Sequence, residues 1–144
     1  MDAHSPKQRS RNMAAIKSKD TKPEMIVRRM LHGLGYRYGL HGKALPGRPD
    51  LVFSARKKVV FVHGCFWHMH DCRWGAVIPQ TRTEFWQNKR RSNVERDVRT
   101  RDLLREAGWR LLIVWECELK SPQRALKKLL AFLERRSPPL QGER

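Results

Sequence analysis

The chain has 144 residues, and its 31 lysines and arginines against 14 acidic residues give a net charge of +17. Hydrophobic residues make up 40% of it, which suffices for a buried core and excludes a wholly disordered chain. The longest apolar run, residues 111–115, is too short to span a membrane, and the basic start of the chain has no signal-peptide pattern. We therefore expect one soluble, intracellular domain that binds a polyanion.

The charge points to nucleic acid as that polyanion. Each phosphate that a lysine or arginine neutralises releases a counterion, so a strongly basic domain gains affinity from every such contact. Binding to an anionic membrane would need a basic helix with a broad apolar face, which the basic segments lack. We expect a nucleic-acid partner and no membrane partner.

The order of expected elements indicates the fold class. Along the chain we expect a basic arm, a folded domain and a tail, at residues 1–20, 21–136 and 137–144. Strands are expected at four places: residues 36–40, 50–53, 59–62 and 109–115. Helices are expected at four places: residues 21–33, 83–90, 92–107 and from about Pro122. The resulting order, α-β-β-β-α-α-β-α, predicts an α/β domain with a mixed central β-sheet flanked by helices.

Two of the helix starts carry a capping pattern. Thr21-Lys22-Pro23-Glu24 has the form of a capping box with proline in the first turn, and Gly33 indicates the end of that helix. Ser92-x-x-Glu95 has the same form and predicts that a second helix begins there, separate from the one over residues 83–90. A tight turn is expected over residues 54–58.

The chain has three cysteines, and two of them lie close to histidines. An odd number of cysteines without a secretion signal argues against disulfides. Cys65, Cys72 and Cys117 together with one histidine would give the four ligands of a structural Zn²⁺ site. The spacing leaves three histidines open as the fourth ligand, and it favours His70 over two others, His63 and His68. The alternative is three buried thiols with surface imidazoles.

The residues around this cluster include large aromatic side chains. Phe66 and Trp67 lie beside the expected ligands, and Trp86 lies in a basic stretch. These rings either pack in the core or serve as wedges or stacking platforms for bases. His32 and His41 are expected on the surface without a role.

The segment from Pro49-Asp50 to His63 has the layout of the PD-(D/E)XK (restriction-endonuclease-like) nuclease core, in which an aspartate, an acidic residue and a lysine surround Mg²⁺ on adjacent strands. Two positions depart from that pattern, since Phe61 replaces the acidic residue and His63 replaces the lysine.

Further motifs in matching order carry a more specific resemblance. They are Leu45-Pro46-Gly47-Arg48-Pro49-Asp50, His63-Gly64-Cys65-Phe66-Trp67-His68, Thr83-Glu84-Phe85-Trp86, Asn93-Val94-Glu95-Arg96-Asp97 and Gly108-Trp109-Arg110. Together they resemble the very-short-patch-repair (Vsr) endonucleases over residues 10–119. The resemblance implies a Mg²⁺-dependent DNA mismatch endonuclease that nicks one strand 5′ to the thymine of a T·G mismatch left by deamination of 5-methylcytosine. It also implies duplex DNA as partner, a monomer located at the bacterial nucleoid in the cytoplasm, and a functional link to a cytosine-5 DNA methyltransferase and other repair proteins.

The resemblance also implies roles for individual residues. Asp50 and the main-chain carbonyl of Val62 would bind Mg²⁺; some relatives have threonine at the second position. His68 would activate water, oriented by Glu24, and His63 would assist at the phosphate. For Glu24, a helix cap alone is the alternative explanation. The implied Zn²⁺ ligands are Cys65, His70, Cys72 and Cys117, and the implied DNA wedges are Phe66, Trp67 and Trp86, with Met13 entering from the minor groove.

Two alternatives stay open at this point. One is a related nickase or restriction-type nuclease with another recognition sequence. The other is a zinc-stabilised DNA-binding protein without catalysis, which would need neither Asp50 nor His68.

Overall fold

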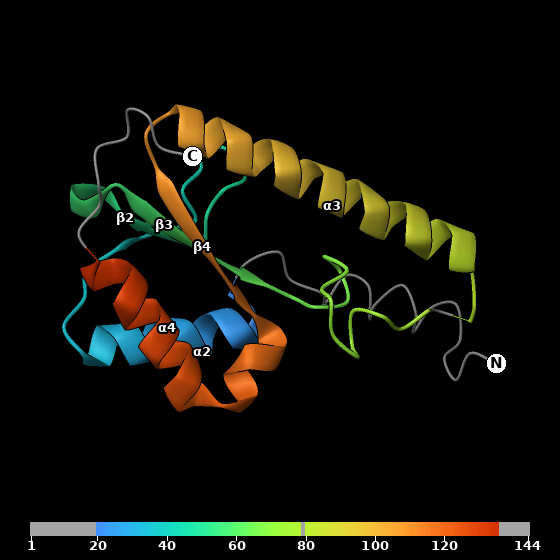
Figure 1. Cartoon of the computed structure of the whole chain (residues 1–144), viewed down its shortest axis with the longest axis horizontal. Helices are drawn as coiled ribbons and strands as arrows, with labels where there is room; N and C mark the ends of the chain where they lie inside the picture. Colours follow the sequence, from blue (N-terminus) through green and yellow to red (C-terminus); the bar gives the residue numbers. More distant parts are fainter. Residues whose placement is uncertain (1–19, 79, 136–144) are drawn as a thin grey trace.

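The central element of the computed structural model is a four-stranded mixed β-sheet in the order β1-β2-β3-β4 (Figure 1). The structure describes residues 20–78 and 80–135. The strands are β1 (Gly39–Leu40), β2 (Leu51–Phe53), β3 (Lys58–His63) and β4 (Arg110–Trp115). β1, β2 and β3 pair antiparallel, whereas β3 and β4 pair parallel, with His63 opposite Trp115 at their ends. The mixed sheet confirms the expected fold class.

Three helices flank this sheet. They are α2 (Lys22–Gly33), α3 (Thr83–Glu106) and α4 (Pro122–Glu134), and two short 3-10 turns are η1 (Ser54–Arg56) and η2 (Glu116–Lys120). Figure 1 shows α2 and α4 together on one side of the sheet and α3 on the other. Among the described helices, none is both long and apolar enough to cross a membrane.

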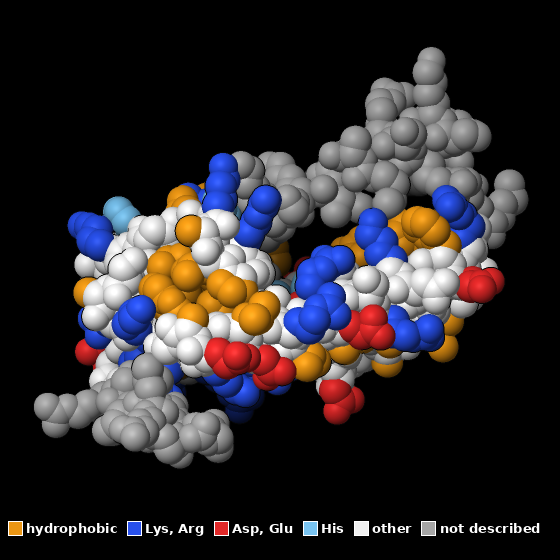
Figure 2. All heavy atoms as spheres, turned by 90° about the horizontal axis from the view of Figure 1, so that it is seen from above, with side chains coloured by type: hydrophobic (Ala, Val, Ile, Leu, Met, Phe, Trp, Pro, Cys, Tyr) orange, Lys and Arg blue, Asp and Glu red, His pale blue; other side chains and the backbone are white. Residues whose placement is uncertain are grey.

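The core lies mainly between the sheet and the pair α2–α4. Apolar side chains from these helices meet the strands there, and most are fully buried: Val27, Leu31, Leu51, Phe53, Val60, Val114, Leu119, Ala125, Leu129 and Leu133. On the α3 side the buried cluster is smaller, with only Val52, Val59, Phe61 and Leu104. Most of α3 therefore projects into solvent, and Figure 2 shows basic side chains spread along this face.

The two helices expected over residues 83–107 form one helix, α3, so the expected break at Ser92 is wrong. The segment contains neither glycine nor proline, and Ser92 and Glu95 are exposed positions inside the helix. Their spacing matches a capping box, but no residue interrupts the main chain there. The first expected strand is also shorter than predicted and consists only of β1.

The other expected ends are close to the observed ones. α2 begins after Thr21, whose hydroxyl accepts a hydrogen bond from the Glu24 amide at 3.3 Å. A side chain from the sheet caps the C-terminal end of α4. The buried Lys58 ammonium donates to the carbonyls of Phe132, Leu133 and Arg135 at 2.7, 3.2 and 2.6 Å. The first feature caps a helix locally, and the second attaches a helix end to the sheet. The expected arm, including Met13, and the expected tail lie outside the described residues, except for the arm's last residue.

Candidate functional site

The parallel pair β3–β4 determines where the site lies. The two strands end side by side. The residues that follow them therefore meet at the C-terminal end of this strand pair, and they are Gly64-Cys65 and Glu116-Cys117. The Cys117 amide donates to the Cys65 sulfur at 3.4 Å, which fixes the two thiols next to each other. Cysteines 52 residues apart in sequence become neighbours through strand pairing alone.

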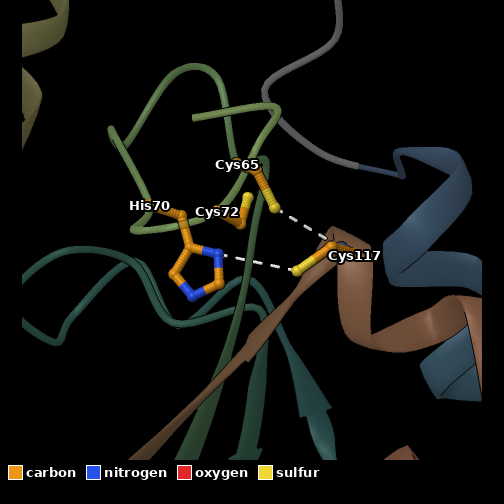
Figure 3. Close-up of side chains that lie close together, drawn as sticks. All are labelled: Cys65, His70, Cys72 and Cys117. Atoms are coloured by element: carbon orange, nitrogen blue, oxygen red, sulfur yellow. Dashed lines mark hydrogen bonds between the residues drawn. The ribbon is translucent and has the colours of Figure 1, made fainter. Parts of the chain in front are cut away.

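The segment after β3, residues 64–78, is named here the aromatic loop. It folds back so that Cys72 and His70 face Cys65 and Cys117 (Figure 3). One ligand atom from each of the four residues lies within 4.8 Å of all the others, and the Cys117 sulfur lies 3.5 Å from His70 Nδ1. Sulfur ligands around a tetrahedral Zn²⁺ stand about 3.8 Å apart. The donor set and the spacing thus fit a zinc ion.

The thiols can serve as metal ligands only as thiolates. Burial raises the pKa of the Cys65 thiol to about 12, so a thiolate there requires a positive charge beside it. Of the three histidines left open by the sequence, the structure places His70 with the cysteines and places His63 and His68 elsewhere.

His63 and His68 belong to a cleft on the α3 side of the sheet. Their rings are stacked, with centroids 3.7 Å apart and planes 5° from parallel. His68 Nδ1 is 2.6 Å from an Asp97 carboxylate oxygen on α3. Burial, with the nearby His68 adding to it, lowers the pKa of His63 to about 3, so this imidazole is neutral at neutral pH. Its Nδ1 is buried without a hydrogen-bond partner among the described residues.

Asp50 lies in the same cleft, just before β2. Its carboxylate accepts a hydrogen bond from the Val62 amide on β3 at 2.7 Å, which joins the two residues across the strands. Burial, partly offset by this hydrogen bond and reinforced by the negative charge of Glu24, raises the pKa of Asp50 to about 7. A buried carboxyl with a raised pKa favours a cation as its partner.

Glu24 does not orient His68 in this structure, contrary to the expectation. Its buried carboxylate lies 2.8 Å from His41 Nε2 and accepts from the Asp20 amide at 2.9 Å. The partner of His68 is Asp97 instead. His41, which was expected on the surface without a role, has a side chain that is 19% exposed and pairs with Glu24. The backbone at His41 is left-handed, with φ +48°. No motif in the sequence indicates this conformation or the contact between His41 and Glu24.

Cations line the cleft from three directions, and Lys22 at the start of α2 provides the first. Lys43 and Arg48 come from the segment between β1 and β2, and α3 contributes three more: Lys89, Arg96 and Arg101. Trp67 borders the same cleft. Its ring centroid lies 5.1 Å from that of Phe66 and 5.6 Å from that of Trp86, so the three expected wedge residues within the described segments form one aromatic row.

A carboxyl and two imidazoles in a cleft lined with cations suit a phosphodiesterase that uses a divalent cation. The comparisons with known proteins agree with this class. Residues 1–74 match the family model of the DNA mismatch endonuclease Vsr. The type II nicking enzyme V.XorIIP of Xanthomonas oryzae is 49% identical over 82% of this chain and 86% of its own length.

Two further relatives extend the match. The DNA mismatch endonuclease Vsr of Escherichia coli is 45% identical over 90% of this chain and 82% of its own length. The type II nicking enzyme V.NmeAIP of Neisseria meningitidis is 45% identical over 83% of this chain and 85% of its own length. The chain therefore belongs to the Vsr DNA mismatch endonuclease family, and it is a DNA endonuclease that nicks its substrate.

Proposed function

We propose that this endonuclease nicks one strand of duplex DNA 5′ to the thymine of a T·G mismatch that arises from deaminated 5-methylcytosine, as a step of very-short-patch repair. The observation that carries the proposal is the convergence of Asp50, His63 and His68 in one cation-lined cleft. Membership of the family and the match to a mismatch endonuclease support the substrate.

Asp50 and the main-chain carbonyl of Val62 would hold the catalytic Mg²⁺. The hydrogen bond between the Asp50 carboxylate and the Val62 amide supports this pair, since it keeps both residues together at the cleft. Carboxylate and carbonyl oxygens are the hard ligands that Mg²⁺ prefers. When bound, the ion neutralises charge on the scissile phosphate and assists the attack of water.

His68 would accept the proton of the attacking water. With Nδ1 engaged by Asp97, the imidazole has Nε2 left as its second nitrogen, and Asp97 favours the tautomer in which Nδ1 carries the hydrogen. His63, neutral and stacked on His68, would contact the phosphate. Glu24 would act on Asp50 and not on His68, because its negative charge contributes to the raised pKa of Asp50.

A structural Zn²⁺ at Cys65, His70, Cys72 and Cys117 would fix the aromatic loop to the end of β4. Phe66, Trp67 and Trp86 would then enter DNA from the major-groove side beside the mismatch, and Met13 from the minor groove. A mismatched step is easier to unstack than a paired one, so such wedges select for weak pairing.

We further propose that the protein acts as a monomer at the nucleoid in the cytoplasm, alongside a cytosine-5 DNA methyltransferase and other repair proteins. A second candidate function is a nickase for another sequence context, since relatives with 45–49% identity carry the name of type II nicking enzymes. The two candidate functions would use the same residues of this chain and differ in the DNA that is cut, which is a T·G mismatch for the first and a particular recognition sequence for the second.

The test uses end-labelled duplexes that differ only in one base, with T·G or T·A at the same position, in a series of flanking sequences. With Mg²⁺ the T·G duplexes should show a single break 5′ to the thymine, and the T·A duplexes none. Cleavage of both duplexes alike would overturn the mismatch substrate in favour of a sequence-specific nickase. The absence of any break in all contexts would remove the catalytic assignment.

A further inference from the structure

Arg90 is a buried cation in the exposed half of α3. Arg90 is only 1% exposed, whereas the neighbouring Arg91 is exposed. The hydrogen-bond partners of its guanidinium among the described residues are all uncharged. Burying a charge without an opposite charge is costly unless every donor is satisfied, so such an arginine needs a dense set of acceptors.

The acceptors come from both ends of the aromatic loop. Nε donates to the Phe66 carbonyl at 2.7 Å, and Nη1 donates to the Val77 carbonyl at 2.8 Å. Nη2 donates to the Gly75 carbonyl, and the Gln87 side chain on α3 accepts from Nη1 at 2.9 Å. The guanidinium carbon also lies 4.2 Å from the centre of the Phe66 ring. A single side chain thus ties the start and the end of the loop to α3.

Two further contacts restrain the loop, one to α3 and one within the loop itself. Asn93, three residues further along α3, donates to the Trp67 carbonyl at 3.0 Å. Gly75 packs so closely on the loop that a Cβ there would lie 1.8 Å from the His70 carbonyl oxygen. The loop is therefore held on one side by the cysteine cluster and on the other side by α3.

The aromatic row depends on this second attachment. Phe66 and Trp67 belong to the loop and Trp86 belongs to α3, so the 5.6 Å spacing between Trp67 and Trp86 spans two segments. The cysteine cluster lies at the ends of the strands and fixes only the loop. Arg90 fixes the loop relative to the helix that carries the third ring.

We propose that Arg90 is a specificity-determining positioning residue, which joins Phe66, Trp67 and Trp86 into one rigid wedge. The inference rests on the proposed entry of these rings into mismatched DNA. A rigid wedge enters a weakly paired step at little cost in ordering, whereas a loosened loop would have to be ordered on entry; a well-paired step resists entry in either case. Arg90 is buried and adds nothing to phosphate binding, so affinity for paired DNA does not depend on it.

The test compares Arg90→Lys with the matched control Arg91→Lys, which changes an exposed neighbour in the same way. Lysine keeps the charge but lacks the planar fork of donors that reaches several carbonyls at once. Binding to T·G and T·A duplexes is measured without Mg²⁺, together with zinc content and thermal unfolding. We expect Arg90→Lys to lose about tenfold in T·G affinity, or ~1.4 kcal/mol, and less than twofold in T·A affinity. Arg91→Lys should change neither.

A milder variant, Gln87→Ala, removes one acceptor and covers the case in which Arg90→Lys fails to fold. It should lower T·G affinity two- to threefold and leave T·A affinity unchanged. Equal losses on both duplexes, or none on either, would overturn the role of Arg90. A wild-type protein without preference for T·G would overturn the proposed function itself. In a wild type that does prefer T·G, an unchanged preference in both variants would overturn only this inference.

Discussion

Two clusters of side chains share one end of the sheet, and their chemistry differs. The first, Cys65, His70, Cys72 and Cys117, offers three sulfurs and one nitrogen, which are ligands for Zn²⁺. The second, around Asp50, His63, His68 and Asp97, offers oxygen and imidazole nitrogen and lies in the cleft. In sequence they interleave, since residues 63 and 68 join the cleft and residues 65 and 70 join the cysteines.

The difference shows how one short segment can serve both stability and chemistry. The loop that supplies the sulfur ligands also carries His68, so a metal bound at the cysteines would fix the imidazole that works in the cleft. We therefore expect the cysteine cluster to control folding and the cleft to control turnover. The predictions below test that separation.

The largest effect is expected from Cys117→Ser. A structural zinc contributes about 10 kcal/mol or more, which is comparable to the whole stability of a domain. The variant should lose its zinc, unfold at least about 10 °C lower and lose nicking with the fold. Metal analysis and thermal unfolding measure this. His68→Ala, from the cleft, is the control and should keep both zinc and melting temperature. A zinc-loaded, stable Cys117→Ser protein would contradict the ligand assignment.

Asp50→Asn should abolish nicking and spare the fold. Loss of a metal carboxylate removes several kcal/mol of transition-state stabilisation, so single-turnover nicking should fall by about 10³-fold or more. Zinc content should stay the same, and the melting temperature should not fall, because asparagine removes a carboxylate that burial disfavours. Nicking at the wild-type rate would exclude Asp50 from catalysis.

Asp97→Asn should slow the chemical step through His68. Asparagine preserves the shape but no longer favours the tautomer with hydrogen on Nδ1, so kcat should fall by about 10²-fold with KM for DNA unchanged. Asp102→Asn, an exposed position on the same helix, is the matched control. Equal effects of the two variants would show that α3 charge, and not His68, is responsible.

The Mg²⁺ requirement should depend on pH. The pKa of Asp50 is raised to about 7, so a proton competes with the cation below that pH and the carboxylate is free above it. The Mg²⁺ concentration that gives half-maximal nicking should therefore rise about tenfold for each pH unit below 7 and become constant above it. Nicking assays from pH 5.5 to 8.5 measure this midpoint. A constant midpoint across that range would contradict the prediction.

Trp115→Phe should have the smallest effect. The Trp115 ring lies between the two clusters, stacked on His70 at 4.1 Å and edge-on to His63 at 5.3 Å. Phenylalanine retains an aromatic surface, so stability should fall by about 1 kcal/mol and nicking by less than threefold. Unfolding and nicking rates measure both. A hundredfold loss of nicking with zinc retained would show that the clusters act through this ring and are not separate.

The sequence predicts the strands and the cysteine cluster well because both follow from local patterns. Short runs of β-branched residues define β2 and β3, and scarce cysteines near histidines predict a metal site. The sequence narrows the fourth ligand to three histidines. Residue spacing favours His70, and the way the aromatic loop folds back places that histidine with the cysteines.

The sequence does not predict the contacts between segments that are distant along the chain. Asp97 lies in a motif that supports the family resemblance, but its pairing with His68 requires α3 to lie beside the aromatic loop. The contact of Glu24 with His41 joins α2 to the residue after β1, and no local pattern predicts either this contact or the left-handed backbone at His41. The unbroken course of α3 likewise shows that a capping pattern predicts a helix start only where the main chain is free to turn.

The capping of the C-terminal end of α4 by Lys58 has a consequence for local unfolding. Unwinding the last turn of α4 would leave a buried ammonium from β3 without its three carbonyl acceptors, so that turn is coupled energetically to the sheet. Helix ends ordinarily fray on their own, but here we expect amide hydrogen exchange in the last turn of α4 to match the slow exchange of β3. The final helix and the strand that ends at His63 then form a single cooperative unit.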